Sequence, residues 1–286
     1  MARILVCRGI KAGELFLEAA IYGAAYLSVF LLLGMIVYLF FRGFGVLDIT
    51  FFTSVTSIYA GTTGIAGNLV NTVYILALAL VAAVPVGVGA AVYLNEYAKK
   101  GRFVRVVEFA FDILAGIPSV IFGLFGMTFF GRVLGLGYSV LNGALTLALM
   151  VLPLIVRNTK EALSAVPDGW RNSAFGMGAT KWYMIRTILI PAAAPGILTG
   201  VILAAGRIVG ESAALLFTAG SARALPRLGA AGLFGRIRES GGTLAVELYL
   251  QMQNGEYETA FGIGCVLLMA TFMMEAGVKM LHSGKK

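Results

Sequence analysis

The sequence predicts an all-α polytopic membrane protein with six transmembrane helices, and three observations lead to this prediction. The mean hydropathy is +0.90, and 59% of the 286 residues are apolar. Only 13% are charged, against about 25% in an ordinary soluble domain. Six nearly uncharged stretches reach about 18 residues, which is enough to cross a hydrocarbon core at ~1.5 Å per residue. This composition excludes a soluble enzyme.

Each predicted span has its own features. The first carries no charge and is too long for a signal peptide, which has a short apolar core. The third and fourth are joined by a tight turn with Arg132 and three glycines, so a helical hairpin is expected. The fifth is interrupted by Arg207 and Glu211. We place the spans at residues 19–41, 72–94, 113–130, 138–156, 192–217 and 259–278.

Lysine and arginine set the expected orientation, because short cytoplasmic loops carry an excess of both. Fifteen of the 22 fall on one side of the spans and six on the other. Both termini are therefore expected in the cytoplasm, with a cytoplasmic segment at 1–18 followed by a six-span domain at 19–286. External segments are expected near 42–71, 131–137 and 218–258. The last holds four arginines, either as a solvated loop or as a mouth that attracts anions: Arg223, Arg227, Arg236 and Arg238.

Several kinds of chemistry are excluded by what the sequence lacks. There is no G-x-x-x-x-G-K-[ST] phosphate loop, so we do not expect this chain to hydrolyse ATP through one. One histidine, His282, and two cysteines, Cys7 and Cys265, are too scattered for a metal site or a disulfide framework. A voltage sensor repeats arginine along one span, whereas only Arg207 lies within a span here. No catalytic residue is predicted, and any energy source is expected on another chain.

Residues 157–191 form a polar, amphipathic segment between the fourth and fifth spans. Pro167–Gly169 marks a helix start and Gly178–Thr180 marks a break, so two short helices are expected at the membrane surface. Such a helix can place apolar side chains in a groove of a partner protein, or it can lie on lipid. The apolar side chains in question are Trp170, Phe175 and Met177.

Arg207 is the most informative residue, because an arginine that faces lipid near mid-span costs at least ~2.5 kcal/mol. It must therefore face protein or water. Glu211 lies four residues further on, so an ion pair on one helical face is expected. That pair either locks helix packing or offers a cationic step to an anion, with Glu211 as the counter-charge. We favour the second interpretation, because a planar guanidinium donates two parallel hydrogen bonds to an oxyanion.

The third span contains a predicted break. Pro118 lacks the N–H that would bond to Leu114, and Gly116 weakens the same turn. Ser119 is a candidate cap for the restarted half-helix, whose N-terminus would present N–H groups to an anion. An ordinary proline kink that only shapes packing is the alternative.

Other residues receive structural interpretations. Glu108 and Asp112 are interpreted as charges that favour the positive end of a helix dipole. Cys265 is expected to be a small buried residue. Two pairs of glycines on the fifth span have the small-xxx-small spacing that lets helix backbones approach closely, namely Gly196 with Gly200 and Gly206 with Gly210.

Part of the segment 157–191 resembles the EAA-type coupling loop of ABC importer permeases, whose pattern is Glu-Ala-Ala, then Gly, then Ile-x-Leu-Pro. The corresponding positions are Gly178, Ala179, Ile188, Ile190 and Pro191, with Ile190 in place of the leucine. Asn172, Ser173 and Ala174 replace the Glu-Ala-Ala, so the glutamate associated with docking is absent. The resemblance implies that an ATPase docks here, on Trp170, Asn172, Ser173, Ala174, Gly178, Ala179, Ile188 and Pro191.

Two further motifs resemble signatures of the permeases of the phosphate-specific ABC transporter (the Pst system). They are GIPSVIFGLFG at Gly116–Gly126 and GRIVGESAALLFTAG at Gly206–Gly220. The similarity extends from Asn71 to Tyr249, and the short N-terminal part is more like the A-type permease than its C-type partner. The chain is thereby identified as a member of the MetI-like family of binding-protein-dependent transport permeases. A type I ABC importer permease-like fold is expected.

The resemblance also implies a function and a set of partners. The expected role is half of the translocation path of an ATP-driven importer of inorganic phosphate in a bacterial or archaeal cell membrane. The expected partners are a second permease (PstC-like), a dimer of ATP-binding subunits that holds ATP and Mg (PstB-like) and an external phosphate-binding protein (PstS-like). The expected substrate path comprises Arg207, Glu211, Gly116, Pro118 and Ser119.

Three alternatives to phosphate import stay open. One is a permease for another oxyanion such as molybdate, sulfate or phosphonate. Another is an ion-driven secondary transporter or anion channel, in which inverted repeats are common. The third is a membrane subunit for assembly or sensing that transports nothing.

Overall fold

A computed structural model of the chain describes residues 12–57, 62–99, 101–225 and 235–283. Most of these residues are helical, and five helices are long and apolar enough to cross a membrane. A sixth span is reached if two helices joined at a sharp bend are counted as one. The prediction of an all-α membrane-spanning protein is confirmed.

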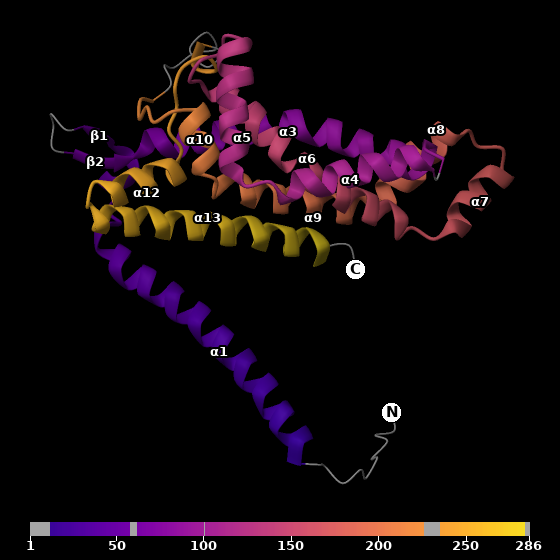
Figure 1. Cartoon of the computed structure of the whole chain (residues 1–286), viewed down its shortest axis with the longest axis horizontal. Helices are drawn as coiled ribbons and strands as arrows, with labels where there is room; N and C mark the ends of the chain where they lie inside the picture. The colour runs from indigo at the N-terminus through magenta and orange to yellow at the C-terminus, as the bar shows by residue number, and fades with distance from the viewer. Residues whose placement is uncertain (1–11, 58–61, 100, 226–234, 284–286) are drawn as a thin grey trace.

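Five long helices run side by side along the molecule (Figure 1): α3 (Ala66–Val92), α4 (Arg102–Gly116), α6 (Val140–Ser164), α9 (Ile190–Val209) and α13 (Tyr257–Ser283). One end carries the short helices α7 (Asp168–Gly176) and α8 (Lys181–Met184). The other end carries α2 (Ile49–Thr53), β1 (Val55–Ser57), β2 (Thr62–Ile65) and α12 (Leu244–Gln253). The strands pair antiparallel, with Val55 opposite Ile65.

The remaining elements join or extend these helices. α5 (Ser119–Phe125) stands across the long helices in Figure 1 and packs on α10 (Ala213–Thr218). Three π-helical segments continue α3, α5 and α8: Tyr93–Tyr97, Gly126–Val133 and Ile185–Leu189. A 3-10 turn, Phe44–Val46, follows α1 (Ala12–Gly43).

α6 is the centre of the bundle and packs between α3 and α9. Its residues Leu147, Val151 and Ile155 are fully buried, in one cluster with Ile75 of α3 and Ile208 of α9. Alternating bulky and small side chains on the facing helices close the space between them. The core of the described residues is therefore built around one face of α3, two faces of α6 and one face of α9.

Glycines bring α9 against α6, as predicted for one pair. A Cβ at Gly196 would lie 2.6 Å from Cβ of Ala162, and a Cβ at Gly200 would lie 2.6 Å from Cβ of Asn158. The prediction for Gly206 and Gly210 is wrong, because they lie beyond this crossing. A Cβ at Gly206 would meet nothing within 4 Å, and one at Gly210 would meet only the Gly206 carbonyl oxygen at 3.7 Å.

Two of the six predicted spans have wrong boundaries, whereas the other four overlap α1, α3, α6 and α13. α6 extends to Ser164, so residues 157–164 of the predicted coupling segment belong to the fourth helix. The stretch 113–130 is not continuous, because α4 ends at Gly116 and α5 starts at Ser119 after a bend of 103°. The stretch 192–217 is also divided, since the helical run begins at Lys181, ends at Val209 and is followed by the separate α10. Pro191 does not start that run; it lies within it, at the second residue of α9 and directly after the π-helical segment Ile185–Leu189.

The hairpin between the third and fourth spans is confirmed. The π-helical end of α5 and the start of α6 are joined by Leu134–Ser139, in which Gly135 and Gly137 take positive φ angles of 69° and 56°. This left-handed conformation is open to glycine at little cost. The Ser139 side chain then caps α6 by accepting a hydrogen bond from the backbone N–H of Asn142.

α1 leaves the bundle, and its N-terminal end lies far from the other helices (Figure 1). None of the most apolar stretch of this 30-residue span is buried within the chain. Only its last turns touch α13, where the Cys265 thiol donates to the Leu39 carbonyl oxygen at 3.3 Å. Cys265 is fully buried, as expected. Cys7 lies outside the described residues.

The close packing of α9 on α6 can be tested at its glycines. In Gly200→Ala the new Cβ would lie 2.6 Å from Cβ of Asn158. We therefore expect the free energy of unfolding to fall by about 1–3 kcal/mol. Gly206→Ala is the matched control on the same helix, where the new methyl group meets no neighbour. Thermal unfolding of the two purified variants in detergent should separate them, and equal midpoints would contradict this packing.

Candidate functional site

Arg207 lies in the last turn of α9 and faces a cavity of about 400 Å³ between α4 and α6. The register of Gly200 against Asn158 places it level with the middle of α6, where Met150 and Pro153 line the same cavity. The side chain is exposed and makes no hydrogen bond or ion pair with any described residue. The structure therefore presents a free guanidinium to a cavity inside the bundle.

The predicted ion pair between Arg207 and Glu211 is wrong. Two residues four positions apart lie on the same helical face only while the helix continues, and α9 ends at Val209. Glu211 lies in the break, where its Oε1 accepts a hydrogen bond of 3.2 Å from the backbone N–H of Ala214. The carboxylate thus satisfies an otherwise free donor in the first turn of α10.

The predicted break in the third span is confirmed at Ile117 and Pro118, both of which have extended backbone angles. Ser119 is the first residue of α5 and makes no capping hydrogen bond, since Pro118 occupies the capping position. The prediction that Ser119 caps the half-helix is therefore wrong. Gly116, Pro118 and Ser119 lie just beyond Ala115, which lines the cavity of Arg207, but they do not line it themselves.

Two carboxylates that the sequence left with a minor role lie at this cavity. Glu108, Phe111, Asp112 and Ala115 line it from one face of α4. Pro153, Arg157, Lys160 and Ser164 line it from one face of α6. The spacing of three and four residues was a usable signal, because it places these side chains in a row on each helix. That the row on α4 faces the row on α6 could not be known from the sequence, because it depends on how the two helices pack.

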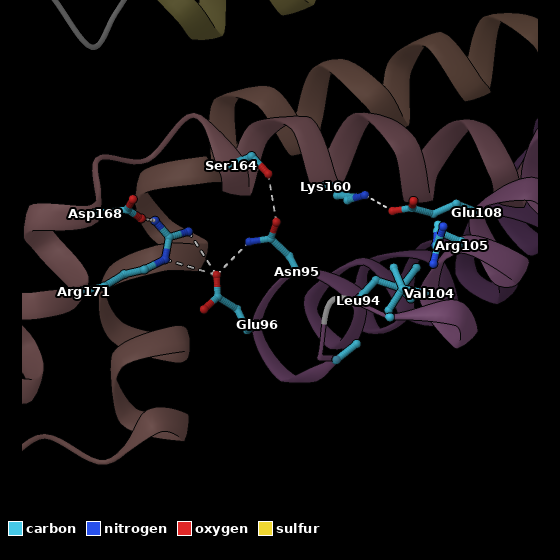
Figure 2. Close-up of a pocket in the computed structure, with 12 residues that line it drawn as sticks. Leu94, Asn95, Glu96, Val104, Arg105, Glu108, Lys160, Ser164, Asp168 and Arg171 are labelled. Atoms are coloured by element: carbon cyan, nitrogen blue, oxygen red, sulfur yellow. Dashed lines mark hydrogen bonds and ion pairs between the residues drawn. The ribbon is translucent and has the colours of Figure 1, made fainter.

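A second cavity, of about 850 Å³, adjoins the first toward the end of the bundle that carries α7 (Figure 2). Leu94, Glu108, Lys160 and Ser164 line both cavities. Lys160 and Glu108 point toward one another across the space between α6 and α4, and they form an ion pair. Arg105 also lines this second cavity and has no ion pair among the described residues.

The prediction of two short helices in the coupling segment holds for α7 only. Gly178, where φ is +81°, separates α7 from α8, and α8 continues through the π-helical segment into α9 as one run from Lys181 to Val209. Asn172 and Ser173 are exposed, whereas Ala174 is fully buried and anchors α7. Three large apolar side chains are at least 48% exposed: Trp170, Phe175 and Met177. Ala179 and Ile188 are half-buried, and Pro191 is exposed. The segment thus presents apolar side chains outward from a helix fixed at its inner face.

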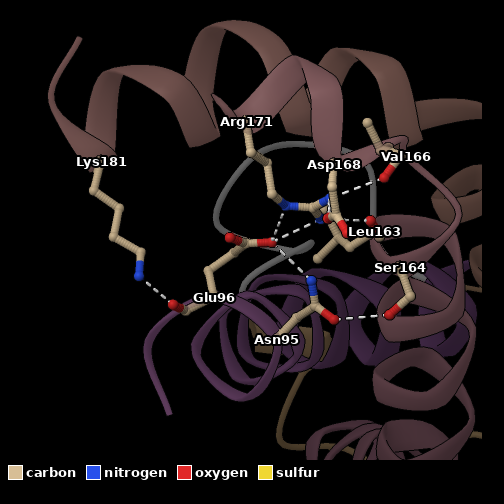
Figure 3. Close-up of polar contacts among 8 residues, drawn as sticks. All are labelled: Asn95, Glu96, Leu163, Ser164, Val166, Asp168, Arg171 and Lys181. Atoms are coloured by element: carbon tan, nitrogen blue, oxygen red, sulfur yellow. Dashed lines mark hydrogen bonds and ion pairs between the residues drawn. The ribbon is translucent and has the colours of Figure 1, made fainter. Parts of the chain in front are cut away.

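A partly buried ion pair that the sequence did not reveal holds α7 on the bundle (Figure 3). Arg171 Nη2 lies 3.0 Å from Glu96 Oε1, and their side chains are only 15% and 7% exposed. Arg171 also donates to the carbonyl oxygens of Leu163 and Val166 and to Asp168, so every arm of its guanidinium has an acceptor. We call the pair of Arg171 and Glu96 the α7 clamp.

The π-helical segment at the end of α3 positions Glu96 for this clamp. Asn95, in the same segment, donates to Glu96 at 2.7 Å and accepts from the Ser164 hydroxyl at 2.8 Å. Lys181 donates to the Glu96 carbonyl oxygen and lies over the Tyr97 ring. α3, α6, α7 and α8 are therefore joined by one polar network.

The arginines predicted for an external mouth have a different role where the structure describes them. Arg236 is 4% exposed and donates to Asn71, Glu239 and the Ala224 carbonyl oxygen. Arg223 pairs with the buried Glu247 of α12 at 2.8 Å. Neither residue lies in a solvated loop or at a free anion site, because both attach this segment to α3 and α12. Arg238 is exposed, and Arg227 lies outside the described residues.

Known proteins are similar to this chain over most of its length. Residues 83–282 match the family described as binding-protein-dependent transport system inner membrane component. A probable ABC transporter permease, YqgI of Bacillus subtilis, is 38% identical over 66% of this chain and 65% of its own length. The phosphate transport system permease protein PstA of Xylella fastidiosa is 39% identical over 62% of each chain. The matched region thus spans less than two thirds of either relative.

A solved structure shares the fold. An inward-facing form of the MetNI methionine ABC transporter superposes with a TM-score of 0.62 at 18% identity, over 78% of this chain and 96% of that one. The similarity covers the bundle and confirms the expected type I ABC importer permease fold.

The α7 clamp can be tested by removing its cation. Arg171→Gln leaves the Glu96 carboxylate buried without a charged partner, which costs about 3 kcal/mol in comparable pairs. We expect the backbone amides of α7 to exchange with deuterium at least tenfold faster. Arg157→Gln is the control, because its pair with Glu161 is 72% and 67% exposed and contributes little. Equal exchange in both variants would show that the clamp does not hold α7.

Proposed function

The chain belongs to the family of binding-protein-dependent transport system inner membrane components, and from this premise we propose that it is a permease subunit of an ATP-driven importer of inorganic phosphate. Relatives named as phosphate transport permeases match most of its length. The observation that carries the choice of an anion is Arg207, which faces a cavity within the bundle without a partner. We propose that this chain forms half of the translocation path.

The proposed role of Arg207 is to receive the oxyanion within the membrane. An unpaired arginine at this depth is costly, so it is retained only where it faces water or a ligand. Its planar guanidinium can donate two parallel hydrogen bonds to two oxygens of a phosphate. Glu211 supports this site indirectly, by holding the start of α10 next to the end of α9.

The break at Gly116, Pro118 and Ser119 is the proposed hinge of the path. α4 carries two cavity carboxylates, and α5 packs on α10 through Gly123, where a Cβ would lie 2.9 Å from Ala214. A hinge between α4 and α5 lets the cavity wall move while the contact between α5 and α10 stays in place. In this proposal the chain itself performs no covalent chemistry.

The proposed partners follow from the same assignment. An ATPase dimer, with ATP and Mg bound to it, docks on the exposed apolar side chains of α7. A second permease completes the path, and an external binding protein delivers phosphate. Both termini of this multi-pass membrane protein are placed in the cytoplasm in this proposal, on the side of α7.

The transport proposal is tested by reconstituting the chain with its second permease, ATPase and binding protein in proteoliposomes. We expect ATP-dependent uptake of radiolabelled phosphate in the wild type. Arg207→Ala should reduce it at least a hundredfold with the complex intact, because the cationic step is lost. Near-normal uptake in this variant would remove Arg207 from the path, and uptake of sulfate or molybdate instead of phosphate would reassign the substrate.

Docking on α7 is tested at Met177, whose side chain is 79% exposed. Met177→Glu places a charge on the proposed contact and should abolish co-purification of the ATPase without lowering the thermal midpoint of the chain. Leu225→Glu, at an exposed apolar residue of the opposite end, is the control and should co-purify normally. Retention of the ATPase by Met177→Glu would place the docking surface elsewhere.

A further inference from the structure

We propose that the ion pair between Lys160 and Glu108 is a gate on the release route of the transported oxyanion. In this inference the anion leaves the cavity of Arg207 by taking the place of the Glu108 carboxylate on the Lys160 ammonium group. The inference rests on the proposed function, because it requires an anion to reach Arg207. It adds a binding step that neither the sequence motifs nor the relatives point to.

The position of the pair supports a gate. We call the cavity of about 400 Å³ the deep cavity and the second cavity, of about 850 Å³ and nearer α7, the outer cavity. Arg207 lines only the deep cavity, whereas Arg105 and Arg171 line only the outer one. Lys160 and Glu108 line both. An anion that moves from the deep cavity to the outer one therefore passes this pair.

The cations form a series along this route. Arg207 lies at the deep end, level with Pro153, and Lys160 lies about two turns further along α6. Arg105 follows at the outer cavity, where it is exposed and has no carboxylate partner among the described residues. Carboxylates also line this route, since Asp112 and Glu161 lie at the cavity of Arg207. In this inference the anion moves from one positive charge to the next and so keeps a counter-ion at each step.

The pair has the exposure that an exchangeable contact requires. The side chains of Lys160 and Glu108 are 35% and 36% exposed, whereas those of the α7 clamp are 15% and 7% exposed. Arg171 is fixed by four acceptors, but Lys160 has only Glu108 among the described residues. A lysine ammonium carries three donors on a flexible stem and accepts a new partner without a fixed geometry. The α7 clamp is thus suited to a fixed contact, whereas Lys160 is suited to exchange its carboxylate partner for another anion.

A purely structural tie between α4 and α6 is the competing explanation, and the two explanations predict different patterns. A structural tie is broken by neutralising either Lys160 or Glu108, so both variants would lose the same amount of uptake. A gate is asymmetric, because Lys160 binds the anion and Glu108 competes with it. Lys160→Gln removes the binding group, whereas Glu108→Gln removes only the competitor.

The experiment measures ATP-dependent uptake of radiolabelled phosphate by the full complex in proteoliposomes, together with ATP hydrolysis. We expect Lys160→Gln to lower uptake at least tenfold while hydrolysis continues, and Lys160→Arg to restore at least half of the wild-type rate. Glu108→Gln should lower uptake less than fivefold, because Lys160, the binding group, is retained. Its uptake should also be inhibited by phosphate on the release side at a concentration at least fivefold lower, because the freed ammonium group retains product.

Lys99→Gln is the matched control, since it removes an exposed lysine from the same end of the bundle without lining either cavity. It should leave uptake and product inhibition unchanged. Equal losses in Lys160→Gln and Glu108→Gln, with wild-type uptake present, would overturn the gate and leave the proposed function standing. A wild-type complex that takes up neither phosphate nor another oxyanion would overturn both.

Discussion

The close approach of α6 to its two neighbours is the constraint on which the rest of the structure depends. Gly87 of α3 and Gly200 of α9 let these helices lie directly on α6, where a side chain on either would collide with Ile155 or Asn158. In lipid the apolar exterior provides no hydrophobic drive, so contact at van der Waals distance must hold the helices together. The same contacts fix how far each helix is shifted along α6. That shift sets the height of Arg207 above Lys160, and so orders the charges along the cavities.

The charged residues inside this framework fall into two groups that differ in how completely they are satisfied. Arg171, Arg236 and Glu247 are buried and have several partners each, which repays the cost of removing them from water. Arg207 and Arg105 face cavities without an ion-pair partner among the described residues, and Lys160 has one partner, Glu108. The first group fixes segments that are distant in sequence, and the second group leaves positive charge free for a ligand. In the proposed function, stability and transport therefore depend on different residues of the same polar class.

Most of the helices could be predicted from the sequence because a long uncharged run has one stable outcome in a bilayer. The break at Pro118 was equally readable, since a missing N–H acts locally. The end of α9 at Val209 was missed, although Gly210 and Glu211 interrupt the apolar run there, and the expected partnership of Arg207 with Glu211 failed with it. The α7 clamp was hidden for another reason: Glu96 and Arg171 are 75 residues apart and meet only through the π-helical end of α3. Tertiary register, which a single sequence does not encode visibly, accounts for this second miss.

The position of α1 has a consequence for how this chain can change over evolutionary time. Along most of its length no other described residue touches it, and a Cβ at Gly23 or Gly34 would have no neighbour within 4 Å. Within the chain, its residues are therefore restrained by average apolarity and not by shape. Substitutions among leucine, valine, phenylalanine and alanine should therefore accumulate freely there. At the α13 contact Gly43 is restricted to glycine, because a Cβ would lie 2.5 Å from the Phe261 carbonyl oxygen. A helix selected by composition at one end and by fit at the other would show that gradient in any collection of its descendants.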